Sequence, residues 1–411
     1  MYSPYHSHTK IVSSIVLFDT FVAILLVLVL SPLMLINALL AIVAGKSALR
    51  SMQRSDALGR PQSLLQWRKG VLKKSALLFN VMKGNISMCG VSLHSVCTND
   101  ALSTLTPLKP GIISLFDTHK SVGNIEMTHG ESIRHHEKHN SIQFNALLIV
   151  KYIICSILYR NSSKGLSSPL KFSLFGININ NLTLNEALEV IFNHTSIRAK
   201  SVFFVNVNSV NLAHDNKDFL ETLNCGDYVF ADGSGVRLGA KHNGINLRDN
   251  LNGTDLLPHI CTQANARKQS LYLLGSAPGV ASTAAKNLQI QFPGLVIAGT
   301  QHGFFNQEQE ADVIADINQS GADICLVAMG SPIQESWVSR NKDKLNTHTT
   351  MAVGGLFDFY SGRISRCPMW MRELGMEWMY RLMQEPKAKF NRYVVGNPLF
   401  LLRLFTQVKN S

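Results

Sequence analysis

The sequence predicts an α/β protein with three parts: a membrane-anchored α+β module at the N-terminus, a Rossmann-like parallel sheet with helices on both faces, and a basic helical appendage at the C-terminus. Three observations support this prediction. Residues 20–45 contain no charged side chain. Between residues 171 and 361, short apolar runs alternate with helix-like segments, which is the pattern of a parallel sheet covered on both faces. The segment from residue 362 to residue 411 is rich in arginine and lysine.

The composition limits the classes of partner and site. A chain of 411 residues can hold two or three domains, and its formal net charge of +12 favours an acidic partner such as a membrane surface, nucleotide phosphates or nucleic acid. The seven cysteines include no C-x-x-C pair, so we expect neither a disulfide framework nor a zinc site, and a reducing compartment fits. We expect no metal ion and no cofactor.

The uncharged run predicts a membrane anchor within residues 1–46. It is long enough to cross a bilayer and too long for the core of a signal peptide. Lys10 is the only lysine or arginine before it, whereas eight lie between residues 46 and 74, which places the downstream side in the cytoplasm. Ser31-Pro32 interrupts the run near its middle. Two forms stay open: a re-entrant helix whose two ends share the cytoplasmic side, and a spanning helix with a proline kink.

Residues 47–160 have a less regular pattern, in which apolar pieces at 71–82 and 147–159 alternate with polar stretches. Residues 118–141 contain five histidines, and we interpret this stretch as a solvated loop because no cysteine accompanies them and their spacing fits no metal motif. Residues 161–170 contain serine, glycine and proline, which predicts a linker. The histidines are His119, His129, His135, His136 and His139.

From residue 171 to residue 361 the alternation is regular. Asp232 ends one apolar run and is followed by Gly233-Ser-Gly235. A carboxylate at the carboxyl end of a parallel strand is placed where open α/β sheets bind ligands, and it could accept a proton from a sugar hydroxyl. The structural alternative is that Asp232 caps a helix in a glycine-rich turn. The predicted strands are 202–207, 228–232, 270–274, 295–299, 323–329 and 349–353, and the predicted helices are 209–223, 253–264, 278–291, 307–319 and 332–345, with a further helix beginning near residue 236.

Glycines follow most of the predicted strands. They allow a backbone to approach a ligand closely, and the helix N-termini that come next favour phosphate. The segment Leu274-Gly-Ser-Ala-Pro-Gly279 is the best candidate for a turn that faces a phosphate. Several such turns in one domain favour a nucleotide or nucleotide-sugar ligand. The glycines are Gly233, Gly235, Gly275, Gly279, Gly330, Gly354 and Gly355.

The segment from residue 362 carries nine lysines and arginines against three glutamates. Met371, Leu374, Trp378 and Leu382 recur at helical spacing, which predicts an amphipathic helix. Tryptophan beside arginine on such a helix suits a membrane interface, and a core helix packed on the sheet is the alternative.

Ordered motifs extend over more than 200 residues of the chain. They include Ala231-Asp-Gly-Ser-Gly235, Asn252-Gly-Thr-Asp-Leu256, Gly330-Ser-Pro-Ile-Gln-Glu335, Gly354-Gly-Leu-Phe-Asp358 and Tyr380-Arg-Leu382. With these motifs, residues ~171–405 resemble the WecG/TagA/CpsF glycosyltransferase family. The resemblance implies an inverting transferase with a UDP-sugar donor, typically UDP-N-acetylmannosamine or its uronic acid. The implied acceptor is a polyprenyl-diphosphate-linked sugar at the cytoplasmic membrane face, used to make an exopolysaccharide, capsule or cell-wall polymer; nucleic acid is not a partner, and homo-oligomer formation stays open.

The resemblance also assigns site residues. It implies that Asp232 is the base that deprotonates the acceptor hydroxyl, and Asn206 is a second catalytic candidate. No D-x-D pair occurs in the sequence, so we expect arginines rather than a metal ion to stabilise the UDP leaving group. Two departures, Asn206 for threonine and Asn250 for arginine, fit a subgroup that acts on a different sugar. The expected substrate-binding residues are Asn208, Gly233, Arg248, Asn250, Gly275, Ser276, Gly330, Gln334, Glu335, Gly355, Asp358, Arg363, Arg366, Arg372 and Arg381.

Three stretches of the N-terminal third carry a second resemblance: Leu30-Ser-Pro-Leu33, residues 79–90 and residues 108–112. They are similar to the membrane-anchored initiating sugar-phosphate transferases of polysaccharide assembly. The catalytic acidic dyad of those enzymes should lie just before Phe79, where this chain has Lys73 and Lys74. We therefore expect residues 47–160 to form a degenerate, inactive module that anchors the protein.

Three alternative functions stay open. A bifunctional enzyme would also initiate the lipid-linked glycan, but the missing acidic dyad argues against it. A dinucleotide oxidoreductase is suggested by Gly233-Ser-Gly235 followed by Gly239, although no acidic residue ends a following strand about 20 residues on. A non-enzymatic membrane scaffold would tolerate the substitution Asp232→Ala.

Overall fold

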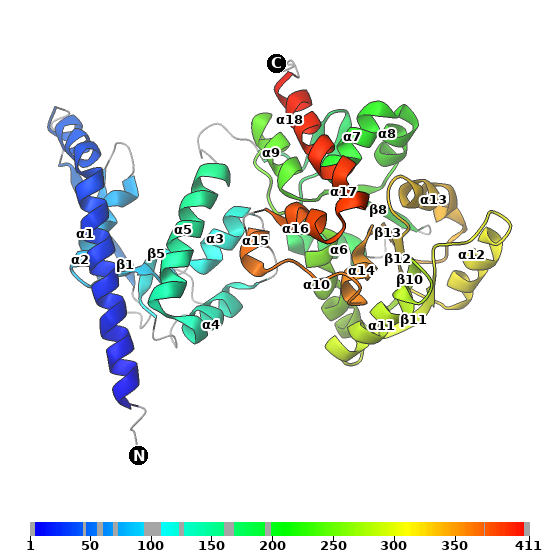
Figure 1. Cartoon of the computed structure of the whole chain (residues 1–411), viewed down its shortest axis with the longest axis horizontal. Helices are drawn as coiled ribbons and strands as arrows, with labels where there is room; N and C mark the ends of the chain where they lie inside the picture. The colour runs from blue at the N-terminus through cyan, green and yellow to red at the C-terminus, as the bar shows by residue number, and fades with distance from the viewer. Residues whose placement is uncertain are drawn as a thin grey trace. The chain divides into compact units, whose positions relative to one another are not determined.

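The chain divides into two compact units, residues 1–121 with 127–160, and residues 122–126 with 161–411. The structure is a computed structural model, shown in Figure 1. It describes residues 5–43, 47–55, 61–68, 73–93, 108–122, 127–159, 168–193, 199–373 and 375–406. Most of the predicted linker, residues 161–167, lies outside the described residues.

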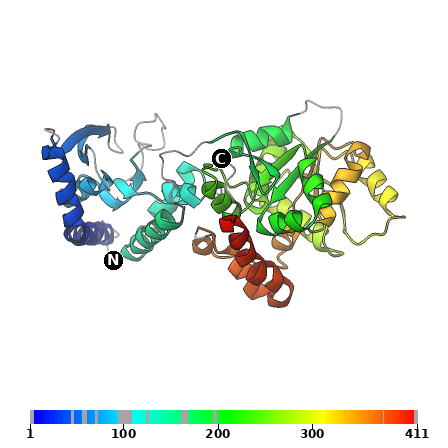
Figure 2. The same ribbon diagram turned by 90° about the horizontal axis from the view of Figure 1, so that it is seen from above.

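The first unit begins with one long apolar helix, α1 (Tyr5–Val43), which contains Pro32. Proline lacks an amide hydrogen, so the carbonyl of Leu28 loses its usual helical partner. The Ser31 hydroxyl donates to that carbonyl at 2.7 Å, which keeps it satisfied inside the apolar run. From residue 14 to residue 43 the helix is long and apolar enough to cross a membrane. Figure 2 shows one part of α1 end-on and the rest from the side, so the helix bends; both predicted forms of the anchor contain such a bend.

The rest of the first unit is a small mixed structure packed against α1. A three-stranded parallel sheet has the order β3-β5-β4, and a separate antiparallel hairpin pairs β1 with β2. Buried Leu64, Trp67 and Leu77 form a core with Ala23 of α1. The elements are β1 (Leu49–Ser55), β2 (Pro61–Trp67), η1 (Lys73–Ala76), α2 (Leu77–Met82), β3 (Ser87–Cys89), β4 (Val91–Ser92), β5 (Pro110–Ile113), α3 (Leu115–Val122), α4 (His129–His139) and α5 (Ile142–Tyr159).

The prediction of a solvated, histidine-rich loop is wrong. Four of the five histidines lie on α4, which starts at a capping box formed by Thr128 and Glu131. His119 on α3 and His136 on α4 are both buried, and His136 Nε2 lies 3.1 Å from Asn145 Oδ1. Within the part of the chain that the structure describes, no three His, Cys, Asp or Glu side chains are grouped as metal ligands.

The second unit is built on an eight-stranded sheet with the order β11-β10-β12-β13-β8-β9-β7-β6. Neighbouring strands are parallel except for the antiparallel pair β6 and β7. The large, mostly parallel sheet is therefore confirmed, and its first two strands are an addition to the prediction. The strands are β6 (Lys171–Leu174), β7 (Ile177–Asn180), β8 (Lys200–Val205), β9 (Tyr228–Ala231), β10 (Ser270–Gly275), β11 (Val296–Gln301), β12 (Ile324–Ala328) and β13 (Thr349–Ala352).

Both faces of this sheet are buried. Along β8, Phe203 and Val205 belong to one apolar cluster, whereas Val202 and Phe204 belong to another. Because alternate residues of a strand point to opposite faces, helices must cover both sides of the sheet. The helices are α6 (Leu184–Phe192), α7 (Val207–Asp215), α8 (Lys217–Asn224), α9 (Ser234–His242), α10 (Gly253–Arg267), α11 (Val280–Gln291), α12 (Glu310–Gln319), α13 (Ile333–Asn341), η3 (Lys342–Lys344) and α14 (Leu356–Tyr360).

Two predicted helices are divided in the structure. The helix expected over residues 209–223 ends before Asn216, whose side chain accepts from the amide of Phe219 and caps α8. The amphipathic helix expected around Trp378 is also wrong as a single element, because Gly375 takes a φ of +69° between α15 and α16. The final elements are α15 (Met369–Glu373), α16 (Glu377–Gln384), α17 (Pro386–Phe390), the π-helical η4 (Asn391–Val395) and α18 (Gly396–Thr406).

The last helix, α18, packs against the sheet of the second unit. Phe400 and Leu404 of α18 are buried in the same apolar cluster as β8. α18 lies beside α7 and α9 (Figure 1), and Asn211 of α7 donates its side-chain amide to the Gly396 carbonyl at 2.8 Å. Arg403 forms an ion pair with Asp215 at 2.6 Å. The C-terminal segment is therefore part of the folded core of this unit.

Candidate active site

Asp232 follows β9 at the carboxyl edge of the sheet. It lies next to Asn206, which follows the neighbouring strand β8. Its amide donates to the Val205 carbonyl at 2.9 Å, which extends the pairing of the two strands. Asn206 donates its side-chain amide to Asp232 Oδ2 at 3.3 Å. The amide oxygen of Asn206 accepts from the backbone amides of Asn208 at 3.0 Å and Ser209 at 3.2 Å. Since these donors fix the oxygen at the start of α7, the amide nitrogen of Asn206 is directed to the carboxylate.

The surroundings of Asp232 make it a stronger base than an ordinary carboxylate. The pKa of its carboxyl is raised to about 6, with burial as the main cause; the hydrogen bond from Asn206 lowers it, the nearby carboxylate of Glu377 raises it, and the charge of Arg392 lowers it. Near neutral pH the group is mostly ionised and still basic enough to take a proton in a transition state.

The turn after Asp232 explains why it does not cap a helix. Gly233 takes a φ of +90° and is itself the N-cap of α9, with no side-chain capping bond. The Gly233 amide donates to Asn250 Oδ1 at 2.7 Å, so Asn250 holds the turn from the next loop. The Ser234 hydroxyl donates to the Gly375 carbonyl at 3.3 Å, which ties the turn to the C-terminal segment. The capping alternative for Asp232 is therefore wrong.

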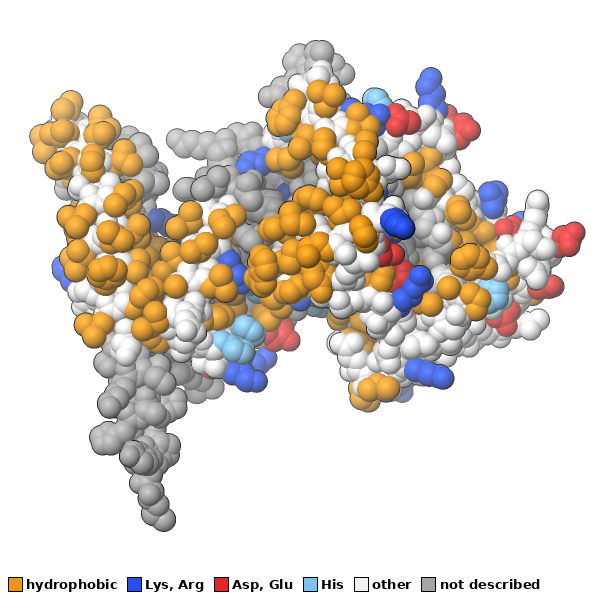
Figure 3. All heavy atoms as spheres, in the orientation of Figure 1, with side chains coloured by type: hydrophobic (Ala, Val, Ile, Leu, Met, Phe, Trp, Pro, Cys, Tyr) orange, Lys and Arg blue, Asp and Glu red, His pale blue; other side chains and the backbone are white. Residues whose placement is uncertain are grey.

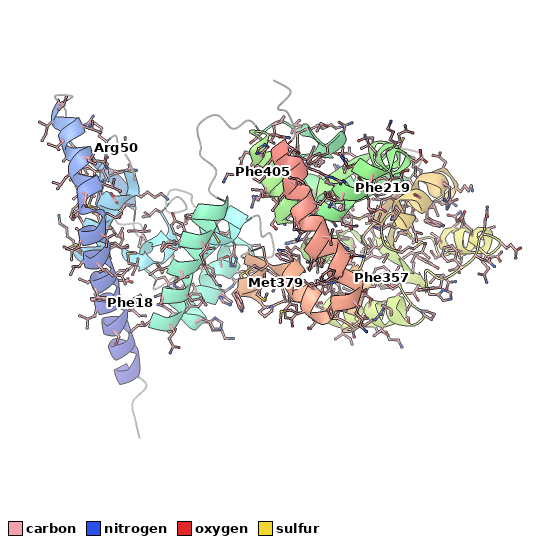
Figure 4. The ribbon with its side chains drawn as sticks, turned by 45° about the horizontal axis from the view of Figure 1, so that its top comes forward. Phe18, Arg50, Phe219, Phe357, Met379 and Phe405 are labelled. Carbon is pink, nitrogen blue, oxygen red and sulfur yellow. The ribbon has the colours of Figure 1, made fainter. Side chains whose placement is uncertain are left out.

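A second turn, after β13, brings three of the predicted substrate-binding residues to the carboxyl edge of the sheet. A Cβ atom added at Gly355 would lie 3.5 Å from Arg381 Nη2 and 3.5 Å from Asp358 Oδ2. The Arg381 guanidinium also packs over the Phe359 ring at 4.7 Å and pairs with Glu385 at 3.2 Å. Gly355, Asp358 and Arg381 are therefore brought together as expected. Figure 4 marks Phe357 on α14 and Phe405 near the end of the segment that carries Arg381.

Gln334 joins two of the turns that end strands. Its Oε1 accepts from the amide of Gly330 at 3.2 Å and from the amide of Gly354 at 2.9 Å. Its Nε2 donates to Glu335, which is fully buried and also accepts from the Ser331 hydroxyl. Burial raises the pKa of the Glu335 carboxyl. Both side chains therefore position the turns after β12 and β13 through internal contacts.

At the start of the turn after β10, Gly275 is packed tightly against the backbone of β12. Gly275 takes a φ of +137°, and a Cβ atom there would lie 2.4 Å from the carbonyl oxygen of Ala328. The amide of Ser276 donates to the same carbonyl at 2.8 Å. Glycine at this position is needed for the contact between β10 and β12.

Of the remaining predicted arginines, Arg363 pairs with the Asp358 carboxylate beside the turn at Gly355, whereas Arg248 and Arg366 pair with other acidic residues. Arg248 pairs with Glu186 at 2.7 Å. Arg363 pairs with Asp358 at 3.2 Å, and Arg366 pairs with buried Asp255. Arg372 lies on α15. The arginines expected to act together are thus distributed over several acidic partners.

Three residues at Asp232 were not predicted as site residues: Glu377, Arg392 and Tyr393. The charges of Glu377 and Arg392 act on Asp232, and the Arg392 guanidinium lies 5.3 Å from the centre of the Tyr393 ring. Burial raises the pKa of the Tyr393 hydroxyl, and the charge of Asp232 also raises it. Glu377 directly precedes Trp378 of the predicted amphipathic helix, whereas Arg392 and Tyr393 lie in none of the motifs given for the sequence.

Comparison with known proteins gives the family of the chain. A model described as "Glycosyl transferase WecG/TagA/CpsF family" matches residues 172–411. The chain is 29% identical over 224 residues to the N-acetylglucosaminyldiphosphoundecaprenol N-acetyl-beta-D-mannosaminyltransferase of Staphylococcus aureus strain MW2, an alignment that covers 54% of this chain and 87% of that protein. It is 29% identical over 218 residues to the protein of the same name from strain MRSA252, covering 52% and 85%. The chain therefore belongs to the WecG/TagA/CpsF family and is a glycosyltransferase.

Proposed function

We propose that the protein is an inverting transferase that moves an N-acetylhexosamine-type sugar, N-acetylmannosamine or its uronic acid, from a UDP-sugar to a polyprenyl-diphosphate-linked acceptor. The two staphylococcal relatives are named for the transfer of N-acetylmannosamine to an undecaprenyl-diphosphate-linked N-acetylglucosamine. The product belongs to an exopolysaccharide, capsule or cell-wall polymer. Family membership favours this function over the oxidoreductase and scaffold alternatives.

The observation that carries the proposal is the partly buried Asp232 carboxylate at the carboxyl end of β9, oriented by Asn206. In the proposed step, the acceptor hydroxyl oxygen attacks C1 of the donor sugar while Asp232 takes its proton. The bond between C1 and the phosphate oxygen breaks, and UDP leaves with the electron pair. Attack from the side opposite to the leaving group inverts C1, and Asp232 later releases the proton to water.

The negative charge that forms on UDP needs a positive partner. We propose that Arg381, beside the turn at Gly355, supplies it, together with Lys389, which shares the partner Glu385 at 3.8 Å. We propose that such side chains, rather than a metal ion held by a D-x-D pair, stabilise the leaving group.

The surface of the C-terminal helices suits a lipid-linked acceptor. Figure 3 shows hydrophobic side chains gathered over these helices. Together with the nine basic residues of the segment, this surface fits the interface of an anionic membrane. We propose that it contacts the cytoplasmic face of the inner membrane. The exposed large side chains are Trp370, Met383, Phe390, Val394, Val395, Leu401, Leu402 and Phe405.

For the first unit we propose an anchoring role without sugar-phosphate transfer. Lys73 and Lys74 open η1 at the place where an acidic dyad is expected. The apolar helix α1 gives this unit a segment that can enter a bilayer. A sugar-phosphate transfer assay with the full chain and polyprenyl phosphate should show no product; robust product would favour the bifunctional alternative.

The test of the proposed function is a release assay for UDP. The full chain in detergent is given a panel of UDP-sugars with a short polyprenyl-diphosphate-linked N-acetylglucosamine. We expect acceptor-dependent UDP release with an N-acetylmannosamine-type donor. Asp232→Asn should abolish it, whereas Asp312→Asn on the exposed face of α12 should leave it unchanged. If no UDP-sugar gives acceptor-dependent release, the proposal is wrong.

A further inference from the structure

Two hydrogen bonds hold the C-terminal segment beside Asp232. The Ser234 hydroxyl, two residues after Asp232, donates to the Gly375 carbonyl at 3.3 Å. Asn211 of α7 donates its side-chain amide to the Gly396 carbonyl at 2.8 Å, and α7 begins directly after the residue that donates to the Asp232 carboxylate. The stretch between these two contacts, from α16 to η4, is therefore held next to the base.

Two aromatic side chains of this stretch contact each other. The ring centres of Trp378 on α16 and Tyr393 on η4 lie 6.1 Å apart, and the Arg392 guanidinium lies 5.3 Å from the centre of the Tyr393 ring. These contacts hold the half-buried Tyr393 ring, so its hydroxyl has a defined direction. Within the part of the chain that the structure describes, this hydroxyl forms no hydrogen bond. Since a tyrosine hydroxyl withdrawn from water usually has a partner, the group is available to a ligand.

The Tyr393 hydroxyl senses both ends of the proposed site. Burial raises the pKa of the hydroxyl, so it stays protonated at neutral pH and can donate a hydrogen bond. Two of the charges that act on it belong to the base and its acidic neighbour, and another belongs to the arginine beside the turn after β13. The four charged side chains are Arg392, Arg381, Asp232 and Glu377.

The strand order gives the distance between the two ends. β8 lies between β9 and β13, so the turn at Asp232 and the turn at Gly355 are two strand spacings apart, roughly 10 Å. In the proposed reaction, C1 of the donor sugar lies between the acceptor oxygen at Asp232 and the leaving phosphate at the Gly355 turn. The sugar ring would therefore occupy the space between these turns, beside Tyr393.

We propose that Tyr393 binds the sugar unit of the donor, by donating a hydrogen bond from its hydroxyl to an oxygen of the N-acetylhexosamine. This inference rests on the proposed function and names a residue that contacts the sugar rather than the nucleotide. The hydrogen bond fixes the ring with C1 facing the acceptor oxygen, which favours in-line attack. Trp378 is a positioning residue, because it acts through its contact with the Tyr393 ring.

The test compares the wild type with Tyr393→Phe, which removes the hydroxyl and keeps the ring. Tyr228→Phe, at the amino end of β9, is the matched control and should behave as the wild type. With the full chain in detergent, we expect Tyr393→Phe to lower kcat/KM for UDP-N-acetylmannosamine by roughly 10-fold, the size of one hydrogen bond. The affinity for UDP, measured by calorimetry, and the KM for the acceptor should stay unchanged, because neither molecule carries the transferred sugar.

Three results overturn the inference while leaving the proposed function in place, provided that the wild type transfers sugar. Tyr393→Phe could transfer as the wild type does. It could weaken UDP binding by the same factor as transfer, which would mean that the hydroxyl supports the nucleotide site or the fold. It could raise only the KM for the acceptor, which would assign the hydroxyl to the acceptor. If the wild type transfers from no UDP-sugar, the proposed function fails and this inference fails with it.

Discussion

The substitution Asp232→Asn should reduce activity and raise stability at the same time. The carboxyl of Asp232 has a pKa of about 6 in the folded protein against an ordinary value of 3.8, with burial as the main cause. A difference of this size corresponds to about 3 kcal/mol, by which the folded state is destabilised when the carboxyl is ionised. Asparagine has nearly the same shape, can still accept from Asn206 and carries no charge to desolvate.

The sign of the effect follows from the direction of the pKa change. A raised pKa means that the folded state binds the proton more tightly than the unfolded state, so stability is highest below pH 3.8 and falls as the pH rises to about 6. The variant lacks this dependence. It should therefore be more stable than the wild type above pH 6, by up to about 3 kcal/mol, and equal to it below pH 4.

Thermal unfolding of the full chain in detergent, between pH 4 and pH 8, measures the difference. For a unit of this size we expect the midpoint of the variant to rise by roughly 2–4 °C for each kcal/mol. Sugar transfer should fall by roughly 100-fold or more, since general-base catalysis contributes that much. Asp312→Asn is the control for a solvated carboxylate. A stability difference that does not change with pH would refute the desolvation argument, and retained transfer would refute the base.

Three further predictions concern Asn206 beside Asp232 and two turns at the carboxyl ends of other strands. Asn206→Ala removes a bond that lowers the pKa of Asp232, so the acidic limb of the profile of kcat/KM against pH should move to higher pH. Gly275→Ala would place a Cβ atom 2.4 Å from the carbonyl oxygen of Ala328 in a left-handed turn, and thermal unfolding should show a loss of roughly 2–4 kcal/mol. Gln334→Ala leaves the amides of Gly330 and Gly354 without their acceptor. We expect a roughly 10-fold fall in UDP affinity and a smaller loss of thermal stability than that of Gly275→Ala.

The central strands could be predicted because they are buried on both faces. Every residue of β12 is buried, so Ile324–Ala328 forms an unbroken apolar run. The hairpin of β6 and β7 has no such run, since the four residues of β6 alternate exposed and buried positions and the four residues of β7 include Asn178 and Asn180. The break at Asn216 and the helix after Thr128 depend on side-chain caps, which local composition alone did not reveal.

The candidate site was only partly predictable. Asp232 could be found because a strand end followed by glycine is a local feature of the chain. The carboxylate partner of each arginine could not be predicted, because it depends on which carboxylate lies within 4 Å of the guanidinium after folding. Arg363 and Arg366 look equivalent to Arg392 in the sequence, yet the first two have carboxylate partners, whereas Arg392 forms no ion pair with a carboxylate among the described residues. Only the folded arrangement distinguishes them.

The C-terminal segment sets two properties of the site together. Glu377, at the start of α16, raises the pKa of Asp232, and Arg392, on η4, acts in the opposite direction. The same segment is held in place by the contact of Ser234 with Gly375 and by the buried Phe400. Loosening the segment would solvate Asp232, which lowers its basicity, and would also withdraw the cations that we propose for the leaving group. The base and the leaving-group site should therefore be lost together, since one folded segment supports both.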